Sequence, residues 1–244
     1  MVITSLENEK VKNLIRLNKK KYRDITSLYL VEGDHLVMEA FKSGVLEEVI
    51  LEENNDFSIE MPITYVSSKI INAISSVETP TNIIGVCKKK SSNQIVGNKI
   101  LLLDELQDPG NLGTIIRSAV AFNIDTIILS ENTVDLYNPK VIRATQGMMF
   151  HTNIITMDMA LAIDNIKNLG IEIYATDVNN GIDARSLEGN AKKSFALIMG
   201  NEGNGVREEI KALADKNLYI KMNSNVESLN VAIATSILLY EMGR

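Results

Sequence analysis

The stretch SLNVAIATSILLYE, residues 228–241, lies near the end of a chain of 244 residues and joins a short polar opening to a long apolar run. Ser228 is a good candidate to cap a helix here, because its side-chain oxygen can accept a hydrogen bond from a free backbone N–H. Asn230 is harder to explain, since asparagine is a poor helix former. It would stand in the first turn, where backbone N–H groups and a side-chain amide can face a ligand. The small residues that follow keep the helix slim and favour close packing against another helix.

Upstream of this stretch, strands and helices alternate from residue 99 onward. Strands are expected at 99–105, 126–130, 152–157, 171–177, 195–200 and 217–222, and helices near 112–122, 138–148, 158–169, 206–215 and 229–242. Repeated β–α units with isoleucine- and leucine-rich strands predict a parallel sheet covered by helices on both faces. In such sheets ligands bind beyond the carboxyl ends of the strands, so the loops there are the place to look for a site.

One unusual loop follows the first of these strands. It belongs to QDPGNLGTIIRSAVAF, residues 107–122, which opens with turn-forming residues. Asn111 can cap the helix that follows, and Arg117 lies one turn into that helix between residues that face the core. From its spacing alone, Arg117 could also be a surface arginine whose stem covers apolar residues.

A second unusual loop follows the strand at 195–200. In GNEGNG, residues 200–205, glycines flank Glu202 and indicate a backbone that turns tightly. A plain turn before a helix would have the same composition. The loop lacks the spacing of a dinucleotide-binding fingerprint and the lysine of a P-loop, so it fits neither kind of nucleotide site.

The first 90 residues are typical of a separate small α/β domain. Helical spacing occurs at 8–18, 34–44 and 67–76, and strands are expected at 27–33, 46–53 and 82–89. The polar stretch KKKSSNQIVGNK, residues 88–99, indicates a linker between the two regions. We therefore expect an N-terminal domain at 1–92, a linker at 93–99 and a C-terminal domain at 100–244.

The composition is that of a folded protein, with 45% hydrophobic and 23% charged residues. No run approaches the roughly 20 apolar residues of a membrane span. The first residues carry acids and no apolar core, unlike a secretory signal, so we expect a soluble cytoplasmic protein. Cys87 is the only cysteine, and His35 and His151 stand at no metal-ligand spacing. No metal site is expected.

The net charge of −6 argues against a protein that coats nucleic acid without specificity. The first 30 residues differ from this balance, with seven basic residues against three acidic ones. From spacing alone this could be a solvated helix face. A local basic patch remains compatible with the overall negative charge.

Taken together, the loops after three of the strands resemble the three motifs of the SpoU (TrmH-like) family of RNA ribose 2′-O-methyltransferases, of the SPOUT class. The first family motif has an asparagine followed six residues later by an arginine, as at Asn111 and Arg117. The second has Gly-x-Glu-Gly-x-Gly, as at 200–205, and the third ends in Ser-Leu-Asn-Val, as at 228–231. NPKVIRATQGMMFH, residues 138–151, resembles a family segment between the first two motifs.

The N-terminal region is similar to the L30e-like RNA-binding domain that precedes many such enzymes, through LVEGDHLVMEA and VETPTNIIGV. The resemblance therefore implies an α/β fold with a C-terminal parallel-sheet domain that carries a deep trefoil knot, preceded by a small L30e-like α/β domain. It implies S-adenosylmethionine as cofactor, bound in the knot mainly by main-chain groups. The corresponding cofactor-binding residues are Met199, Gly200, Gly205, Ile220, Met222 and Leu229.

The resemblance also implies that a ribose 2′-hydroxyl attacks the sulfonium methyl group. The polar residues that correspond to those serving this reaction are Asn111, Arg117, Glu202, Ser228 and Asn230. We interpret Arg117 as holding the adjacent phosphate and stabilising the developing alkoxide, because a guanidinium group stays protonated and makes a poor base. The family forms homodimers with the site near the subunit interface, so Arg117 is a candidate to serve the partner's cofactor.

Family members with this front domain usually modify large-subunit ribosomal RNA, so we expect structured RNA, 23S rRNA, as the substrate. The expected RNA-binding residues are Lys19, Lys20, Lys21, Arg23 and Arg143. A tRNA substrate is the alternative. A non-catalytic RNA-binding protein would have lost motif residues, and a Rossmann-type methyltransferase would leave the second and third motifs unexplained. Lys221 and Ser224 stand where the family often has proline and glycine, a departure that concerns substrate detail.

Overall fold

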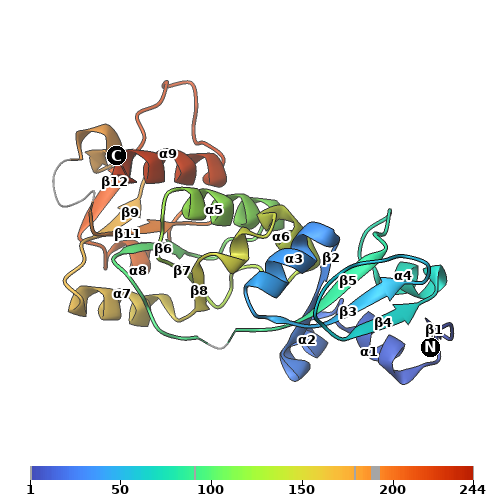
Figure 1. The fold of residues 1–244 in the computed structure, drawn as a ribbon. Coiled ribbons are helices and arrows are strands. Elements are labelled where there is room, and N and C mark those ends of the chain that lie inside the picture. The colour runs from blue at the N-terminus through green and yellow to red at the C-terminus, as the bar shows by residue number, and fades with distance from the viewer. Residues whose placement is uncertain (1, 91, 179, 188–192, 244) are drawn as a thin grey trace. The chain divides into compact units, whose positions relative to one another are not determined.

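The computed structural model describes residues 2–90, 92–178, 180–187 and 193–243. Their contacts divide the chain into two compact units (Figure 1). The first unit comprises Met1–Ser91 and Asp135–Phe150, and the second comprises Ser92–Val134 and His151–Arg244. The segment 135–150, which the sequence analysis assigns to the C-terminal domain, therefore makes its contacts in the first unit.

The described strands of the first unit form a mixed sheet in the order β1-β4-β3-β5-β2. They are β1 (Val2–Ile3), β2 (Leu28–Glu32), β3 (Leu46–Glu52), β4 (Ile63–Val66) and β5 (Ile83–Lys88). The helices are α1 (Glu9–Arg16), α2 (Lys20–Thr26), α3 (Asp34–Lys42), α4 (Ser68–Ile74) and α6 (Pro139–Thr145), with the 3-10 turn η1 (Met148–Phe150). Apolar residues of α1 and α4, such as Leu14 and Ile70, pack on Ile50 and Ile84 of the sheet. The predicted α/β character is confirmed, while β1, β4 and α2 were not predicted.

Two contacts explain why the segment 135–150 belongs to this unit. The ring of Tyr137 lies 4.6 Å from the ring of Tyr29 in β2, measured between centroids. Asp135 forms an ion pair of 2.5 Å with Arg23 of α2. Both contacts join residues that are far apart in the sequence, which no local pattern can reveal.

The described strands of the second unit form a sheet in the order β10-β12-β9-β11-β6-β7-β8, with parallel pairing throughout. They are β6 (Lys99–Leu103), β7 (Thr126–Leu129), β8 (Asn153–Thr156), β9 (Ile173–Thr176), β10 (Ile182–Asp183), β11 (Phe195–Met199) and β12 (Lys216–Tyr219). The central strands β6 and β11 run in register, with Met199 beside Leu103, and β11 is buried along its whole length. The predicted parallel sheet is confirmed.

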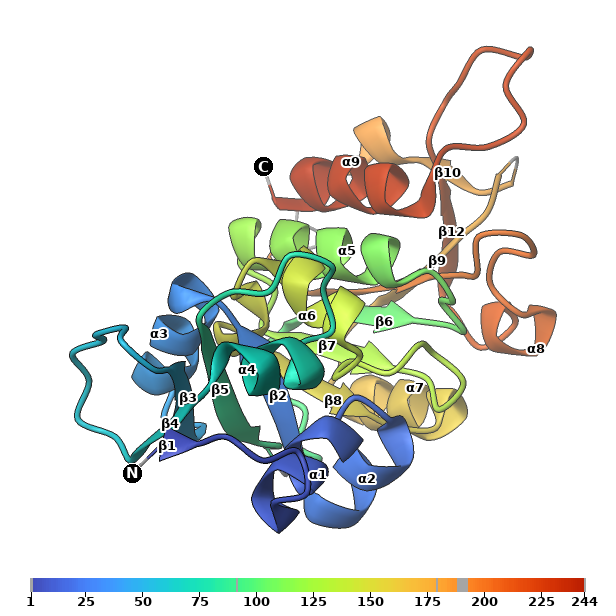
Figure 2. The same cartoon turned by 90° about the vertical axis from the view of Figure 1, so that its right-hand side faces the viewer.

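Helices cover both faces of this sheet. They are α5 (Pro109–Ala121), α7 (Met159–Asn168), α8 (Glu208–Lys211) and α9 (Val231–Gly243), with the 3-10 turn η2 (Ala184–Ser186). Figures 1 and 2 show α5 and α9 side by side on one face, with α7 and α8 on the other. Ser118 Oγ of α5 and Ser236 Oγ of α9 lie 2.7 Å apart, as expected from the small side chains of the last helix.

Three boundaries differ from the prediction. Helix α8 ends at Lys211, because the chain turns to bring the N–H of Asp215 to the carbonyl of Ile173 and begin β12. Strand β12 ends at Tyr219, so residues 220–230 form a loop rather than a strand and helix start. The linker is ordered against the second unit where it is described beyond residue 91, since the N–H of Val96 donates to Thr126 Oγ1 at 3.0 Å.

Within the described residues, no helix is long and apolar enough to cross a membrane. In the same part of the chain, no cluster of three or more His, Cys, Asp or Glu side chains could hold a metal ion.

Candidate active site

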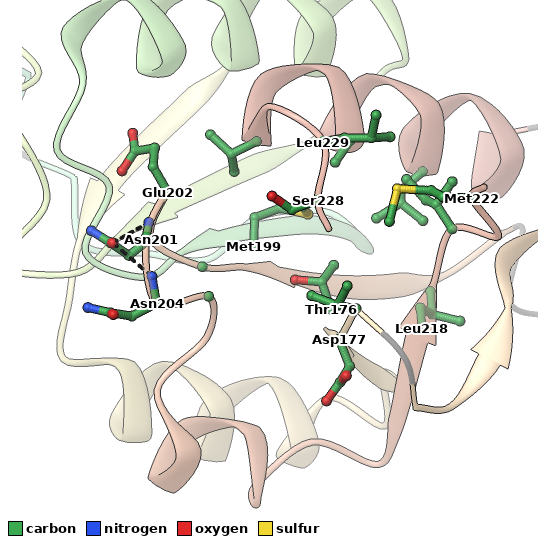
Figure 3. Close-up of a pocket in the computed structure, with 18 residues that line it drawn as sticks. Thr176, Asp177, Met199, Asn201, Glu202, Asn204, Leu218, Met222, Ser228 and Leu229 are labelled. Atoms are coloured by element: carbon green, nitrogen blue, oxygen red, sulfur yellow. Dashed lines mark hydrogen bonds between the residues drawn. The ribbon is translucent and has the colours of Figure 1, made fainter. Parts of the chain in front are cut away.

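A cavity of about 250 Å³ opens beyond the carboxyl ends of β9, β11 and β12 (Figure 3). Its wall is formed by the loop after β11, the loop after β12 and the start of α9. All six residues predicted to bind the cofactor lie on this wall, namely Met199, Gly200, Gly205, Ile220, Met222 and Leu229. Glu202 and Ser228 line it as well. The cavity thus lies beyond the carboxyl ends of parallel strands, where the sequence predicts a site.

The loop after β11 is a tight hairpin that leaves no room for a side chain at Gly200 and favours glycine at Gly205. A Cβ atom on Gly200 would lie 2.0 Å from the carbonyl carbon of Gly205, and Gly205 itself has a φ of +70°. The N–H of each end residue donates to the other's carbonyl, from Asn201 at 3.0 Å and from Gly205 at 2.9 Å. Asn201 Oδ1 accepts from the N–H groups of Gly203 and Asn204, drawn as dashed lines in Figure 3. We call residues 200–205 the glycine hairpin; its close-packed backbone borders the cavity.

Hydrogen bonds join the three motif loops to one another. Asn230 Nδ2 donates to Asn111 Oδ1 at 3.0 Å, and Asn111 Nδ2 donates to Glu202 Oε1 at 3.2 Å. The backbone N–H groups of Gln107 and Asp108 donate to the same carboxylate at 3.2 and 3.1 Å. Glu202 points away from the cavity centre in Figure 3, as these partners require. The glutamate therefore fixes the loop before α5 to the glycine hairpin.

The pKa of Glu202 is lowered in this setting. Burial by itself raises the pKa of the carboxyl group, but N–H donors outweigh it: the backbone of Glu202, the Asn111 amide, and the backbone of Asp108 and Gln107. A carboxylate held ionised by several donors cannot supply a proton near neutral pH. Its role in the site is to accept hydrogen bonds and hold other groups.

Arg117 lies on α5, beyond the cavity wall. Its side chain is exposed, and within the described residues it makes no hydrogen bond or ion pair. A guanidinium group without a protein partner is available to an anionic ligand such as a phosphate.

Both predicted helix caps are wrong. The cap of α5 is Asp108, whose Oδ1 accepts from the N–H of Asn111 at 2.7 Å, because Pro109 occupies the first helical position. The cap of α9 is Asn230, whose Oδ1 accepts from the N–H groups of Ala232 at 2.9 Å and residue 233 at 3.3 Å. Ser228 lies two residues earlier and contributes to the cavity wall instead.

The profile of the SpoU rRNA Methylase family matches residues 98–240, and that of the MRM3-like substrate binding domain matches residues 8–85. The chain belongs to the SpoU rRNA methylase family. It is 37% identical, over 98% of both chains, to the 23S rRNA (guanosine(2553)-2′-O)-methyltransferase RlmP of Bacillus subtilis (strain 168). The sequence resemblance to this family is thereby confirmed.

Solved structures of SpoU and TrmH proteins share this fold. An rRNA methyltransferase from Sinorhizobium meliloti aligns with a TM-score of 0.88 at 30% identity, covering 99% of this chain and 96% of the other. The AdoMet-bound form of an rRNA methyltransferase from the same organism aligns with a TM-score of 0.86 at 29% identity, covering 99% and 97%. The alignment spans both units, so each has a counterpart in these SpoU-type methyltransferases.

The predicted RNA-binding residues of this SpoU protein separate into two groups. Lys19, Lys20 and Lys21 are exposed at the start of α2, and the Nη1 atom of Arg143 donates to Ser76 Oγ at 2.8 Å. Arg23 differs, since its side chain is only 4% exposed and is held by Asp135 and by the carbonyl of residue 17. Arg23 is therefore not part of a basic surface, and the prediction for it is corrected: it holds the segment 135–150 in the first unit.

Sequence reasoning missed several residues of the site. Thr176 and Asp177, at the end of β9, line the cavity. Asp104, at the end of β6, is fully buried and pairs with Arg207 after the glycine hairpin. A polar residue at or directly after the end of a buried strand is the signal that all three share in the sequence.

Proposed function

We propose that this chain transfers a methyl group from S-adenosylmethionine to a ribose 2′-hydroxyl of RNA, with 23S rRNA as the substrate. The observation that carries the proposal is the hydrogen-bonded set Asn111, Glu202 and Asn230 beside a cavity built on the glycine hairpin. The whole-length similarity to a curated 23S rRNA 2′-O-methyltransferase supports the same reaction.

The cavity has the chemistry that this cofactor needs. Met199, Ile220, Met222 and Leu229 provide apolar walls for the adenosine and the methionine chain, and the glycine hairpin offers main-chain polar groups. The tight approach at Gly200 leaves no room for a side chain there. The cofactor, when bound, would supply an electrophilic methyl group and leave as S-adenosylhomocysteine, while the protein positions the 2′-hydroxyl and handles the proton that it loses.

Residues of the chain would act on the RNA as follows. Arg117 binds the phosphate beside the target ribose and stabilises negative charge that develops on the 2′-oxygen. Glu202 holds Asn111 and the turn before α5, and thereby the helix that carries Arg117. Ser228, on the cavity wall, orients the ribose relative to the reacting methyl group.

Ribosomal RNA is favoured over tRNA by the whole-length similarity to a 23S rRNA methyltransferase. The N-terminal unit matches a substrate-binding domain. Lysines 19–21 on this unit are exposed and suit phosphate contacts to folded RNA. Arg143 offers a guanidinium group oriented by Ser76. We therefore propose residues 1–92 as the RNA-binding domain and 100–244 as the methyltransferase domain.

We also propose that the chain works as a homodimer in the cytoplasm. Ile233, Ile237 and Tyr240 recur at helical spacing on α9 and are 54%, 37% and 51% exposed, an apolar stripe that suits burial against a second copy. Helix α9 packs beside α5, which carries Arg117, so this face adjoins the helix of Arg117. That Arg117 serves the partner's cavity is proposed from family membership. A trefoil knot in the segment that includes 220–231 is proposed from family membership.

The test is methyl transfer from radiolabelled S-adenosylmethionine to purified rRNA and, separately, to bulk tRNA, both from cells lacking this protein. Label in 23S rRNA that is lost with Arg117→Ala is the expected result, and mapping of the 2′-O-methyl group would identify the nucleotide. Label in tRNA alone would overturn the choice of substrate. If neither naked RNA nor ribosome assembly intermediates are labelled and the cofactor does not bind, the chain is a non-catalytic RNA-binding protein.

A further inference from the structure

Asp104 is a fully buried acid at the carboxyl end of β6. Its carboxylate receives the guanidinium group of Arg207 in a fork, from Nη2 to Oδ1 at 2.8 Å and from Nε to Oδ2 at 3.2 Å, with Nε also 3.0 Å from Oδ1. The backbone N–H of Arg207 donates to Oδ2 at 3.1 Å. A single arginine thus satisfies both oxygens of this buried acid.

The strand end that carries Asp104 contacts the glycine hairpin at both of its ends, and the ion pair holds its exit. The N–H of Asp104 donates to the carbonyl of Met199 at 2.8 Å, just before the hairpin. The Asp104 carboxylate holds Arg207, two residues after Gly205. A third bond runs from Asn201 Nδ2, inside the hairpin, to the carbonyl of Glu105 at 2.9 Å. Two consecutive residues at one strand end therefore anchor the start, the interior and the exit of this loop.

Stability alone does not account for such a pair. An ion pair with a buried partner gains little over apolar side chains of similar volume, because taking a charge out of water is costly. Here the Asp104 carboxylate is fully buried, while the Arg207 side chain stays 35% exposed. What a forked arginine–carboxylate contact adds is a fixed direction and distance. Here the element whose direction is fixed is the hairpin that forms one wall of the cavity and carries Glu202.

We propose that Asp104 and Arg207 are positioning residues that hold the glycine hairpin in the shape that receives the cofactor and presents Glu202 to Asn111 and Asn230. The inference rests on the proposed function, because it takes S-adenosylmethionine as the ligand of the cavity. Neither residue lies on the cavity wall, so both act through the hairpin.

The test compares Arg207→Met with the double variant Asp104→Asn, Arg207→Met. The single variant leaves a buried carboxylate without its partner and loses stability. The double variant removes both charges, while the amide oxygen introduced by the Asp104→Asn change can still accept from the backbone N–H of residue 207. The urea midpoint of the double variant should therefore return close to that of the unchanged protein. A control is Glu172→Gln with Lys216→Met. This change removes an ion pair at the amino ends of β9 and β12, at the edge of the sheet away from the cavity.

Two measurements decide the proposal: the dissociation constant of S-adenosylmethionine by calorimetry, and amide hydrogen exchange of residues 200–206 without ligand. In the double variant we expect affinity to fall about tenfold or more, equal to about 1.4 kcal/mol of binding free energy, with faster exchange in the hairpin and unchanged exchange in β6. The control should change neither quantity.

Recovery of both stability and affinity in the double variant would overturn the proposal, since the two charges would then only neutralise each other. Faster hairpin exchange with unchanged affinity would overturn it as well. If the unchanged protein binds no S-adenosylmethionine, the proposed function fails and the cofactor role of the pair fails with it. The exchange measurement then still decides whether Asp104 and Arg207 order the hairpin.

Discussion

Replacing Gly200 by alanine should force the backbone of the glycine hairpin apart while leaving the rest of the second unit folded. The added Cβ would lie 2.0 Å from both the carbonyl carbon of Gly205 and the N of Val206, where ordinary contacts begin at about 3.4 Å. Backbone on one side must therefore move by more than 1 Å. Such a shift breaks the paired backbone hydrogen bonds between Asn201 and Gly205, a cost of about 1–3 kcal/mol at about 0.5–1.5 kcal/mol for each bond.

A misplacement of about 1 Å in a positioned site can lower the rate about 100-fold. We therefore expect Gly200→Ala to weaken S-adenosylmethionine binding by calorimetry and to lower kcat/KM for RNA methylation by about that factor. The chain offers a matched control in Gly203→Ala. A Cβ there would meet Asn201 Oδ1 at 3.5 Å, an ordinary contact, in the same hairpin.

Binding of the cofactor by Gly200→Ala within about threefold of the unchanged protein, which is less than about 1 kcal/mol, would contradict the predicted overlap. That prediction is also refuted if Gly203→Ala loses as much affinity as Gly200→Ala. In that case the hairpin would tolerate no change at all, and the specific overlap at Gly200 would explain nothing.

Five other changes test the remaining contacts of the site and of the N-terminal unit. Glu202→Gln should lower kcat/KM about tenfold or more, because an NH₂ group replaces an oxygen that accepts N–H donors. The pKa of Glu202 is lower in the folded than in the unfolded chain, so its carboxylate contributes stability above about pH 4.3 that is lost as the pH falls through the folded pKa. The urea midpoint of the Gln variant should therefore depend less on pH in this acidic range. Arg117→Ala should abolish RNA methylation with unchanged melting temperature and cofactor affinity, because the side chain is exposed and has no bond to lose among the described residues; a large loss of stability would contradict this role. Alanines at 19–21 should weaken RNA binding and reduce its salt dependence without destabilising the fold. Arg23→Ala should instead lower the free energy of unfolding in urea by up to about 3 kcal/mol, because it leaves the 14% exposed carboxylate of Asp135 unpaired. Asn230→Asp should keep the helix cap and the melting temperature but lose methylation, because the carboxylate has no N–H to donate to the motif-one amide; an active Asp variant would show that this bond is dispensable.

The parallel sheet could be predicted because its strands are continuous apolar runs, and parallel strands buried on both faces require that composition. The location of the site followed from the same rule, since ligands gather at the carboxyl ends of such strands. Strand β4 and helix α2 were missed for the opposite reason. Residues 63–65 of β4 are not fully buried, and α2, KKYRDIT, has no apolar periodicity; its place depends on the buried side chain of Arg23.

Partners distant in sequence account for the remaining errors. Arg23 stands beside three lysines and looks like them in sequence, yet its carboxylate partner lies 112 residues away at Asp135. The segment 135–150 has a helical pattern wherever it packs, so its unit is shown by contacts such as Tyr137 against Tyr29 and Asp135 with Arg23. Local rules predict elements; they do not predict which core an element joins.

The contacts of Asn230 explain why an asparagine stands at the start of the last helix. Its Oδ1 atom caps α9 by accepting from the N–H of Ala232, while its Nδ2 atom donates to Asn111 in the motif-one loop. Serine could cap but has no amide to reach the second partner, and aspartate has no donor at all. The choice of asparagine is therefore set by two demands on one side chain, one local and one across 119 residues of sequence. The helix cap is a local contact, so the sequence could indicate that Asn230 is unusual. The bond to Asn111 joins distant parts of the chain, so only the folded structure shows it.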